Sequence, residues 1–243
     1  MGEEKKRLPV GLENFEQIIN DNYYYVDKTG LISELIRNGG MVNLFTRPRR
    51  FGKTLNMSML EHFFSIERDQ SIYDGLEISK DTKLCEEYMG KYPVISISLK
   101  GINAATYEDA FDFAVQIMQR TAEEFQFLSD SEYLSEHDKS VYRELLDSNM
   151  SETVFCGGLK ILSKLLEKHY RLKGFLLIDE YDVPLAKAFE NGYYEQMIFQ
   201  DYVNVFPENY WINTSSNDAV KKFIQMSDNL KTKREIETCL LYT

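Results

Sequence analysis

Three short apolar runs in the chain have the pattern of buried β-strands. They cover residues 41–45 (MVNLF), 92–99 (YPVISISL) and 175–178 (FLLI). The first and third runs are almost continuously apolar, which is typical of strands that are covered on both faces. The second run alternates apolar residues with serine, so we expect this strand nearer to an edge of the sheet.

Amphipathic helical patterns lie around these runs. Apolar residues recur at helical spacing over residues 54–66, 107–127 and 159–172, and Gly174 is the residue that we expect to end the third helix. The acidic, polar stretch 129–151 predicts a peripheral helical excursion or a surface insertion. Because strands alternate with helices, the pattern predicts an α/β fold with a mostly parallel sheet flanked by helices.

The domain organisation changes near residue 200. Residues 1–200 are expected to form one α/β domain, and the 43% of hydrophobic residues in the 243-residue chain supports a packed core. Residues 201–243 show few of the further strands that such a core needs. We therefore expect them to be a divergent helical tail and the α/β core to be incomplete on its C-terminal side.

Composition and charge exclude several classes of protein. The net charge of −11 argues against a protein whose main task is non-specific binding to a phosphate backbone, although it leaves room for a local basic site. Three widely spaced cysteines and three scattered histidines predict a cytoplasmic protein with no disulfide framework and no zinc site. No apolar run is long enough to span a bilayer, and the N-terminus lacks a signal-peptide pattern, so no membrane partner is expected.

The strongest motif is a phosphate-binding loop directly after the first strand. Residues 47–54 read RPRRFGKT, against the pattern GxxxxGK[ST] between a strand and a helix. In such a loop, backbone amides and the helix N-terminus hold the β- and γ-phosphates of a nucleotide. Lys53 would neutralise these phosphates and the Thr54 hydroxyl would bind Mg²⁺. The predicted nucleotide-binding residues are Arg47, Pro48, Arg49, Arg50, Phe51, Gly52, Lys53 and Thr54.

One position of this loop departs from the general pattern. Arg47 stands where the first glycine is expected, which requires a negative φ at that residue or a strain of roughly 1–3 kcal/mol. Arg47, Arg49 and Arg50 also add positive charge to an otherwise acidic protein. The alternative is an accidental GKT at the start of a helix, with the arginines on a solvated turn.

A second motif ends the third strand. Four apolar residues are followed by Asp179 and Glu180, at the strand end where parallel sheets bind ligands. Asp179 would hold Mg²⁺, and Glu180 would orient or deprotonate the water that attacks the γ-phosphate, with Lys53 as the second catalytic residue. The alternative is a strand that ends in a solvated acidic turn. Asp182 is either a further partner of this pair or, as we favour, a cap for the segment after Pro184.

An aromatic stretch precedes the first strand. Residues 23–29 read YYYVDKT. These aromatic side chains either stack on the adenine of a nucleotide or belong to a short strand and turn at the edge of the core.

Together these segments resemble a known family. The chain is similar over roughly residues 8–200 to the bacterial AAA-ATPase-like family, whose members carry YVDKT (residues 25–29), RPRRFGK[ST] (residues 47–54) and IDEYD (residues 178–182). Arginine at position 47 is a feature of that family. The resemblance implies an ASCE-type, AAA-like P-loop NTPase core that binds ATP, with Glu180 as the catalytic glutamate.

The resemblance ends near residue 199. Relatives continue there with further strands and a sensor residue, and many end in a PD-(D/E)XK nuclease-like domain. Residues 210–218 resemble sequence that lies farther downstream in relatives, so the resemblance implies an internal deletion and a truncation in this chain.

Two functions follow from the motifs. The first is a Mg²⁺-dependent ATPase that hydrolyses the β–γ bond of ATP, and for this chain ATP binding is predicted more directly than turnover. The second is a nucleotide-gated module with little or no hydrolysis that contacts a protein or a nucleic acid. A kinase is disfavoured because no motif for an acceptor substrate is visible.

Overall fold

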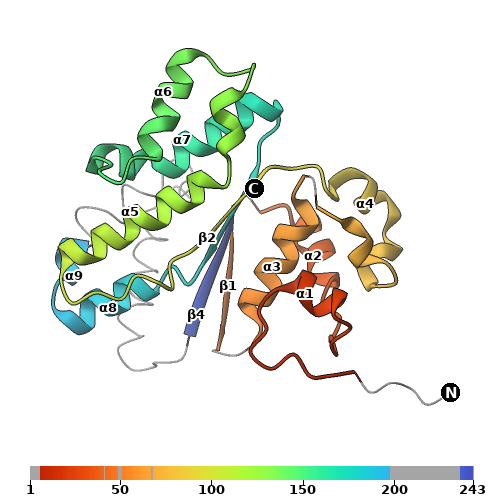
Figure 1. Ribbon diagram of the computed structural model, residues 1–243. Coiled ribbons are helices and arrows are strands. Elements are labelled where there is room, and N and C mark those ends of the chain that lie inside the picture. The colour runs from red at the N-terminus through yellow and green to blue at the C-terminus, as the bar shows by residue number, and fades with distance from the viewer. Residues whose placement is uncertain (1–5, 41, 49–50, 67, 198–235, 243) are drawn as a thin grey trace.

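The computed structural model describes residues 6–40, 42–48, 51–66, 68–197 and 236–242, which form a helix–sheet–helix arrangement (Figure 1). One face of the sheet is covered by α1 (Phe15–Asn20), α2 (Gly30–Asn38), α3 (Lys53–Phe64) and α4 (Thr82–Tyr88). On the other face lie α5 (Tyr107–Glu123), α7 (Glu152–Tyr170), α8 (Val183–Asn191) and α9 (Tyr194–Met197), and α6 (Glu136–Leu145) packs on α5 and α7, farther from the sheet. Three short 3₁₀ helices are η1 (Gln70–Tyr73), η2 (Glu77–Lys80) and η3 (Gln126–Asp130).

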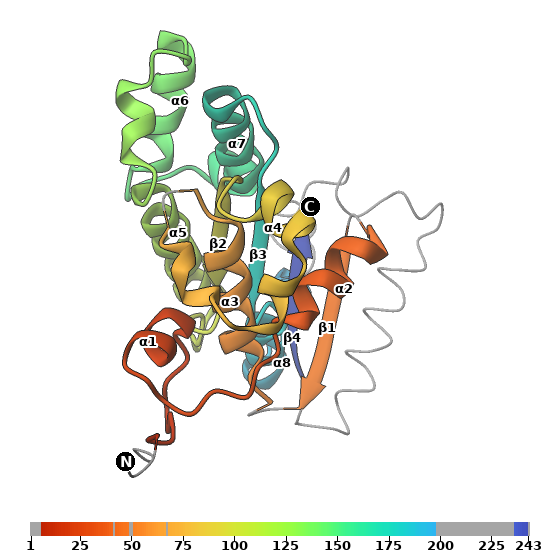
Figure 2. The same ribbon diagram turned by 90° about the vertical axis from the view of Figure 1, so that its right-hand side faces the viewer.

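The described sheet has four strands in the order β1-β4-β3-β2 (Figure 2). They are β1 (Val42–Pro48), β2 (Val94–Ser98), β3 (Phe175–Asp179) and β4 (Ile236–Tyr242). The pair β2–β3 is parallel, whereas β4 is antiparallel to both of its neighbours, β1 and β3. It follows that β1, β2 and β3 all run in the same direction and that β4 alone is reversed.

This sheet confirms the three predicted strands, and all three run in the same direction, as expected for a mostly parallel sheet. The reversed strand β4 makes the described sheet mixed, and it corrects one expectation. Residues 236–242 form a strand rather than part of a helical tail. The physical reason is that β1 and β3 each present a row of backbone groups that need partners, and a strand from a distant segment can supply them. The rest of the predicted tail, residues 198–235, lies outside the described residues.

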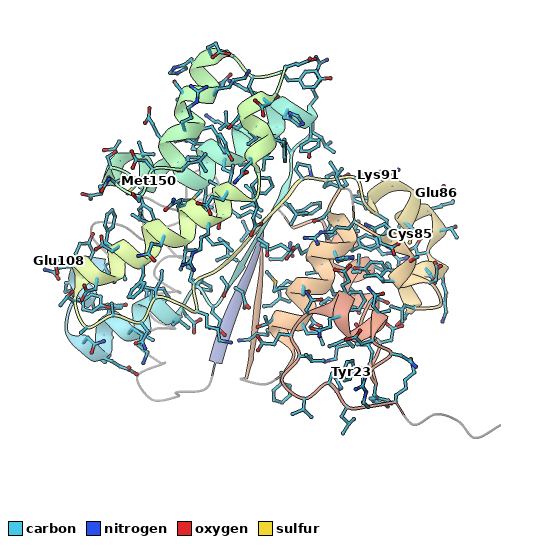
Figure 3. All side chains as sticks on the ribbon, viewed as in Figure 1. Tyr23, Cys85, Glu86, Lys91, Glu108 and Met150 are labelled. Carbon is cyan, nitrogen blue, oxygen red and sulfur yellow. The ribbon has the colours of Figure 1, made fainter. Side chains whose placement is uncertain are left out.

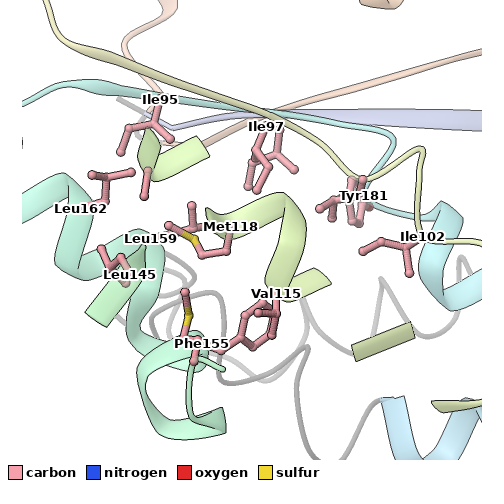
Figure 4. Packing of buried hydrophobic residues seen from close by; sticks show 14 of the residues in the cluster. Ile95, Ile97, Ile102, Val115, Met118, Leu145, Phe155, Leu159, Leu162 and Tyr181 are labelled. Atoms are coloured by element: carbon pink, nitrogen blue, oxygen red, sulfur yellow. The ribbon is translucent and has the colours of Figure 1, made fainter. Parts of the chain in front are cut away.

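Two apolar cores lie on opposite faces of the sheet. Under α5 and α7, Ile95 and Ile97 of β2 pack against Met118, Leu159 and Leu162 (Figure 4). On the other face, apolar residues of α3 pack with strand residues of β2 and β3; they include Met59, Leu60, Phe63, Phe64, Val94, Phe175 and Leu177. Because β3 contributes residues to both cores, its apolar run is continuous, as the sequence pattern predicted.

The predicted excursion at residues 129–151 is helical and more firmly anchored than its polar composition suggested. It contains α6, which begins with a capping box between Ser135 and Asp138. Tyr142 and Leu145 are fully buried, and the Tyr142 hydroxyl donates a hydrogen bond to the Ala122 carbonyl, 2.7 Å away. The excursion is therefore part of the core that lies under α5 and α7.

The end of α7 differs from the expectation. The helix ends at Tyr170, and Arg171 holds the left-handed conformation that closes it, with φ of 56°. Gly174 lies three residues later, next to β3, so it does not end the helix. No helix within the described ranges is both long and apolar enough to cross a membrane.

Candidate functional site

The loop between β1 and α3 joins a strand directly to a buried helix. Strand β1 ends at Pro48, and α3 begins at Lys53. Gly52 occupies the N-cap position with φ of 73°, a left-handed conformation that glycine adopts without a steric penalty. Its carbonyl accepts a hydrogen bond from the Asn56 amide at 2.9 Å, which starts the helix. The predicted strand–loop–helix context of the GKT sequence is therefore present.

The first side chains of α3 lie at different depths. Lys53 is only 5% exposed, although its neighbour Phe51 is 55% exposed. Thr54 is half-buried. The sequence therefore places a buried cationic side chain directly after Gly52, at the start of α3. Of the other predicted loop residues, Arg49 and Arg50 and the side chains of Arg47 and Pro48 lie outside the described part of the structure.

The acidic end of β3 is buried. Asp179 and Glu180 are each 6% exposed, and the Asp179 carbonyl accepts a hydrogen bond from the Leu99 amide at 3.0 Å. This burial contradicts the alternative of a solvated acidic turn. The turn is held by the next residue, because Tyr181 is 2% exposed and packs beside Ile102 in the core under α5 (Figure 4).

Glu180 has a strained backbone, and its surroundings disfavour the ionised form of its carboxyl group. Its backbone has φ of 53°, a left-handed conformation that a residue with a side chain seldom adopts. Burial raises the pKa of its carboxyl group above the ordinary value, and the neighbouring charges of Asp179 and Asp182 act in the same direction. Lys100, which forms a 3.7 Å ion pair with Glu13, acts in the opposite direction. A site with this stored strain and a raised pKa resembles a functional site more than a structural turn.

The sheet brings the two motifs to one edge. Since β1 and β3 run in the same direction, their carboxyl ends lie at the same edge (Figure 2). Phe45 of β1 and Asp179 of β3 both pair with Cys239 of the intervening strand, so the two strands are about 10 Å apart at this level. Strand β1 then continues for three more residues, to Pro48, before the loop turns back into α3.

The residues at this edge fit a hard cation better than a transition metal. Among the described residues, no group of three or more histidine, cysteine, aspartate or glutamate side chains could hold a metal ion. Burial raises the pKa of Glu180, and the charge of Asp179 adds to this, so a cation between the two carboxylates would relieve their repulsion. Mg²⁺ typically takes one or two carboxylates together with substrate phosphates, so this incomplete donor set fits Mg²⁺.

Asp27 and Thr29 form a hydrogen-bonded clamp that holds η2, which the sequence analysis did not predict. The Asp27 carboxylate accepts hydrogen bonds from the Thr29 amide at 2.8 Å, the Thr29 hydroxyl at 2.7 Å and the Glu77 amide at 2.7 Å. The fully buried Thr29 hydroxyl also accepts a hydrogen bond from the Ile78 amide at 3.1 Å. Residues 27–29 therefore attach η2 to the start of α2. The only sequence signal for this clamp was an aspartate two residues before a threonine.

The aromatic residues of the stretch 23–29 do not form the predicted short strand. Residues 23–28 are irregular, and Tyr25 packs edge-on against Phe15 with ring centroids 5.3 Å apart. Burial raises the pKa of Tyr25 to about 12. Tyr23 stacks under Arg7 instead, at the outer edge of the layer that contains α1 (Figure 3). Tyr25 therefore belongs to the edge of the core, as one of the two interpretations expected.

Asp182 stands at the N-cap position of α8, with Pro184 in the first turn. Its side chain, however, makes no capping hydrogen bond, and the backbone at Asp182 is already helical. Asp182 therefore occupies the predicted capping position, but its side chain does not form the hydrogen bond of a cap. Its charge instead adds to burial and to the charge of Asp179 in raising the pKa of Glu180.

Comparison with known proteins places the chain in a family. The layered architecture makes it an α/β protein. Residues 9–227 match the family described as Predicted AAA-ATPase (AAA-ATPase-like), and the chain belongs to this family, which confirms the resemblance seen in its motifs. An "Uncharacterized protein in vnfD 5'region" of Azotobacter chroococcum mcd 1 is 29% identical over 182 residues. The match covers 74% of this chain and 30% of that protein, so the chain spans about a third of this relative. No solved structure matches.

Proposed function

We propose that this protein binds ATP and hydrolyses its β–γ bond in a Mg²⁺-dependent reaction, with an ASCE-type P-loop core. The observation that carries the proposal is the pairing of two features at one sheet edge. One is the buried Lys53 after the left-handed Gly52 at the start of α3. The other is the buried Asp179–Glu180 pair, held two strands away in a sheet where β1 and β3 run in the same direction.

The loop would bind the nucleotide through its phosphates. Backbone amides at the N-terminus of α3 point toward the loop and favour negative charge, because they have no partner within the helix. Lys53 would add a positive charge at the same place, buried enough to act in a low dielectric. Arg47, Pro48, Arg49, Arg50 and Phe51 complete the proposed loop.

Asp179 and Glu180 would have different roles, one in binding the metal and one in activating water. Thr54 and Asp179 would hold Mg²⁺, which when bound neutralises charge on the phosphates. Glu180 would take a proton from the attacking water as the water oxygen bonds to the γ-phosphorus and the bridging oxygen leaves with ADP. A raised pKa suits this role, since a general base works best when its pKa is close to the working pH.

The binding test uses Lys53→Met, which keeps the apolar stem of the buried side chain and removes its ammonium. The exposed Lys83 of α4 supplies the matched control, Lys83→Met. Calorimetric titration with Mg-ATP should show binding by the wild type and by the control, and at least a tenfold loss of affinity in Lys53→Met. Equal affinity in all three proteins would rule out the site.

The turnover test uses Glu180→Gln. If the protein is an ATPase, this variant should bind ATP and release no phosphate, while the wild type releases it. If the wild type binds ATP tightly yet releases no phosphate, the nucleotide-gated module is the correct function. Contacts with a protein or a nucleic acid, and the cytoplasmic location expected from the cysteines, stay predictions.

A further inference from the structure

We propose that Lys28 is a second cationic residue of the nucleotide site and contacts the polyphosphate chain of bound ATP. This inference rests on the proposed function, because it assigns a further contact to the same loop. Lys28 belongs to the YVDKT segment and lies 24 residues before Gly52 in the chain. Neither the phosphate-loop motif nor the acidic motif contains it.

The Lys28 ammonium lies against the loop. A Cβ placed on Gly52 would be 3.7 Å from Lys28 Nζ, so the ammonium lies beside the glycine that precedes α3. Gly52 also has a left-handed φ, which already disfavours a side chain there. A Cβ would touch the ammonium without displacing it, so the left-handed φ is what favours glycine at position 52, and the contact places Lys28 Nζ beside the loop.

The backbone of Lys28 is fixed from both sides. Its amide donates a 3.3 Å hydrogen bond to the Tyr25 hydroxyl, and Tyr25 is itself anchored in the core. The residues that flank it, Asp27 and Thr29, form the clamp that binds the amides of η2. A long flexible side chain on a fixed base has less freedom to lose when it binds a ligand, which is the advantage of preorganisation.

The positive charge of Lys28 beside the start of α3 favours the binding of an anion. Lys28 is exposed, and among the described residues no carboxylate forms an ion pair with it. It lies at the N-terminus of α3, a 12-residue helix whose first amides carry partial positive charge. Two positive groups side by side repel each other, and an anion between them removes that repulsion. A nucleoside polyphosphate is the anion that the proposed site would receive.

The competing explanation is structural: the Lys28 stem covers Gly52 and its charge has no role. Lys28→Met separates the two explanations, since methionine keeps the apolar stem and loses the charge. Lys28→Arg keeps the charge. The control is again Lys83→Met, which removes one positive charge from an exposed position on α4.

Mg-ATP affinity is measured by calorimetry for the wild type and these variants. Lys28→Met should bind about three- to tenfold more weakly, the range of a partly exposed charge-assisted contact. Lys28→Arg should stay within about twofold of the wild type, and Lys83→Met should be unchanged. The deficit of Lys28→Met should shrink at high salt, because exposed charges are screened. Equal affinity of Lys28→Met and Lys83→Met would overturn the inference.

The other outcomes are also decisive. If the wild type binds ATP, Lys53→Met does not, and Lys28→Met binds normally, the proposed function stands and only the inference about Lys28 fails. If the wild type itself binds no ATP, both fail together. If Lys28→Met does not fold, acylation of the wild-type lysines with and without Mg-ATP replaces it. ATP should then protect Lys28 and not Lys83, and equal labelling of Lys28 in both conditions would overturn the inference.

Discussion

Gly174 lies against the carbonyl oxygen of Pro93, closer than any side chain would allow. A Cβ built on Gly174 would fall well inside van der Waals contact with that oxygen. The same oxygen accepts a 2.9 Å hydrogen bond from the Phe175 amide, which is the first contact of the parallel pair β2–β3. This close approach therefore sets the start of the strand that carries Asp179 and Glu180 at its other end.

Gly174→Ala should destabilise the fold. The methyl group must push the two chains apart, and backbone atoms cannot move aside as a flexible side chain can. We expect a loss of about 1–3 kcal/mol in the free energy of unfolding, as for other overpacked sites. Urea denaturation followed by circular dichroism measures it.

Gly157→Ala is the matched control for this substitution. Gly157 lies inside α7, and its added Cβ would contact the flexible Ile161 side chain, with Cδ1 nearest at 3.4 Å. Because alanine is a better helix former than glycine, this variant should be as stable as the wild type or more stable by up to about 1 kcal/mol. If both variants lose equal stability, the close approach at Gly174 is not the cause.

Thr29→Val should weaken the clamp that holds η2. Valine has nearly the shape of threonine and lacks the hydroxyl, so the Ile78 amide loses its buried acceptor. We expect a loss of about 1–3 kcal/mol, the cost of a buried donor without a partner. Thr82→Val, on the exposed start of α4, should change stability by less than about 0.5 kcal/mol. Thermal melts of the three proteins make the comparison.

The clamp should also be sensitive to acid. Burial opposes ionisation of Asp27, but hydrogen bonds from Thr29 and Glu77 and the charge of Lys80 outweigh it and lower the pKa of Asp27 below its ordinary 3.8. A lowered pKa means that the ionised form stabilises the fold above pH 4 and that this contribution is lost as the pH falls through the lowered value. Asp27→Asn should thus be less stable than the wild type at pH 7, and the difference in the free energy of unfolding should become smaller below pH 4. A difference that does not change with pH would contradict this.

Glu180→Gln should stabilise the protein in the absence of nucleotide. Burial and the charge of Asp179 raise the pKa of Glu180 above its ordinary 4.5, so ionised Glu180 costs folding free energy as the pH rises above that value. The variant should therefore unfold at a higher temperature at pH 8, corresponding to about 0.5–2 kcal/mol, and the difference should vanish near pH 4. Glu132→Gln, at an exposed position, should show no such trend.

Arg171→Gly should be more stable than Arg171→Ala. Both variants lose the contact in which the Arg171 guanidinium lies 5.3 Å from the Tyr133 ring centroid, but only glycine removes the strain of the left-handed conformation. We expect a difference of about 1 kcal/mol in favour of glycine. Urea midpoints of the two variants measure this directly, and equal midpoints would show that Arg171 is not strained.

Local patterns predicted most of the elements correctly. The apolar run before the phosphate loop is β1, and the run before Asp179 is β3. The helical spacing after Gly52 is α3, which begins one residue before the predicted start. These predictions succeeded because the period of apolar residues reports which side of an element is buried, and that information lies within a few neighbouring residues. The predicted end of α7 was wrong, because Arg171 closes the helix in a left-handed conformation and an arginine at that position gives no sign of it in the sequence.

The sequence by itself determined the family, the two motifs and the strands and helices that carry them. Only the tertiary structure decided which strands are neighbours, and it placed β4 in reverse between β1 and β3. It also decided that Glu180 is buried and strained, and that Lys28 lies against Gly52. The reason is physical: strand pairing, burial and the approach of an ammonium to a glycine join residues far apart in the chain, and no local pattern records such contacts.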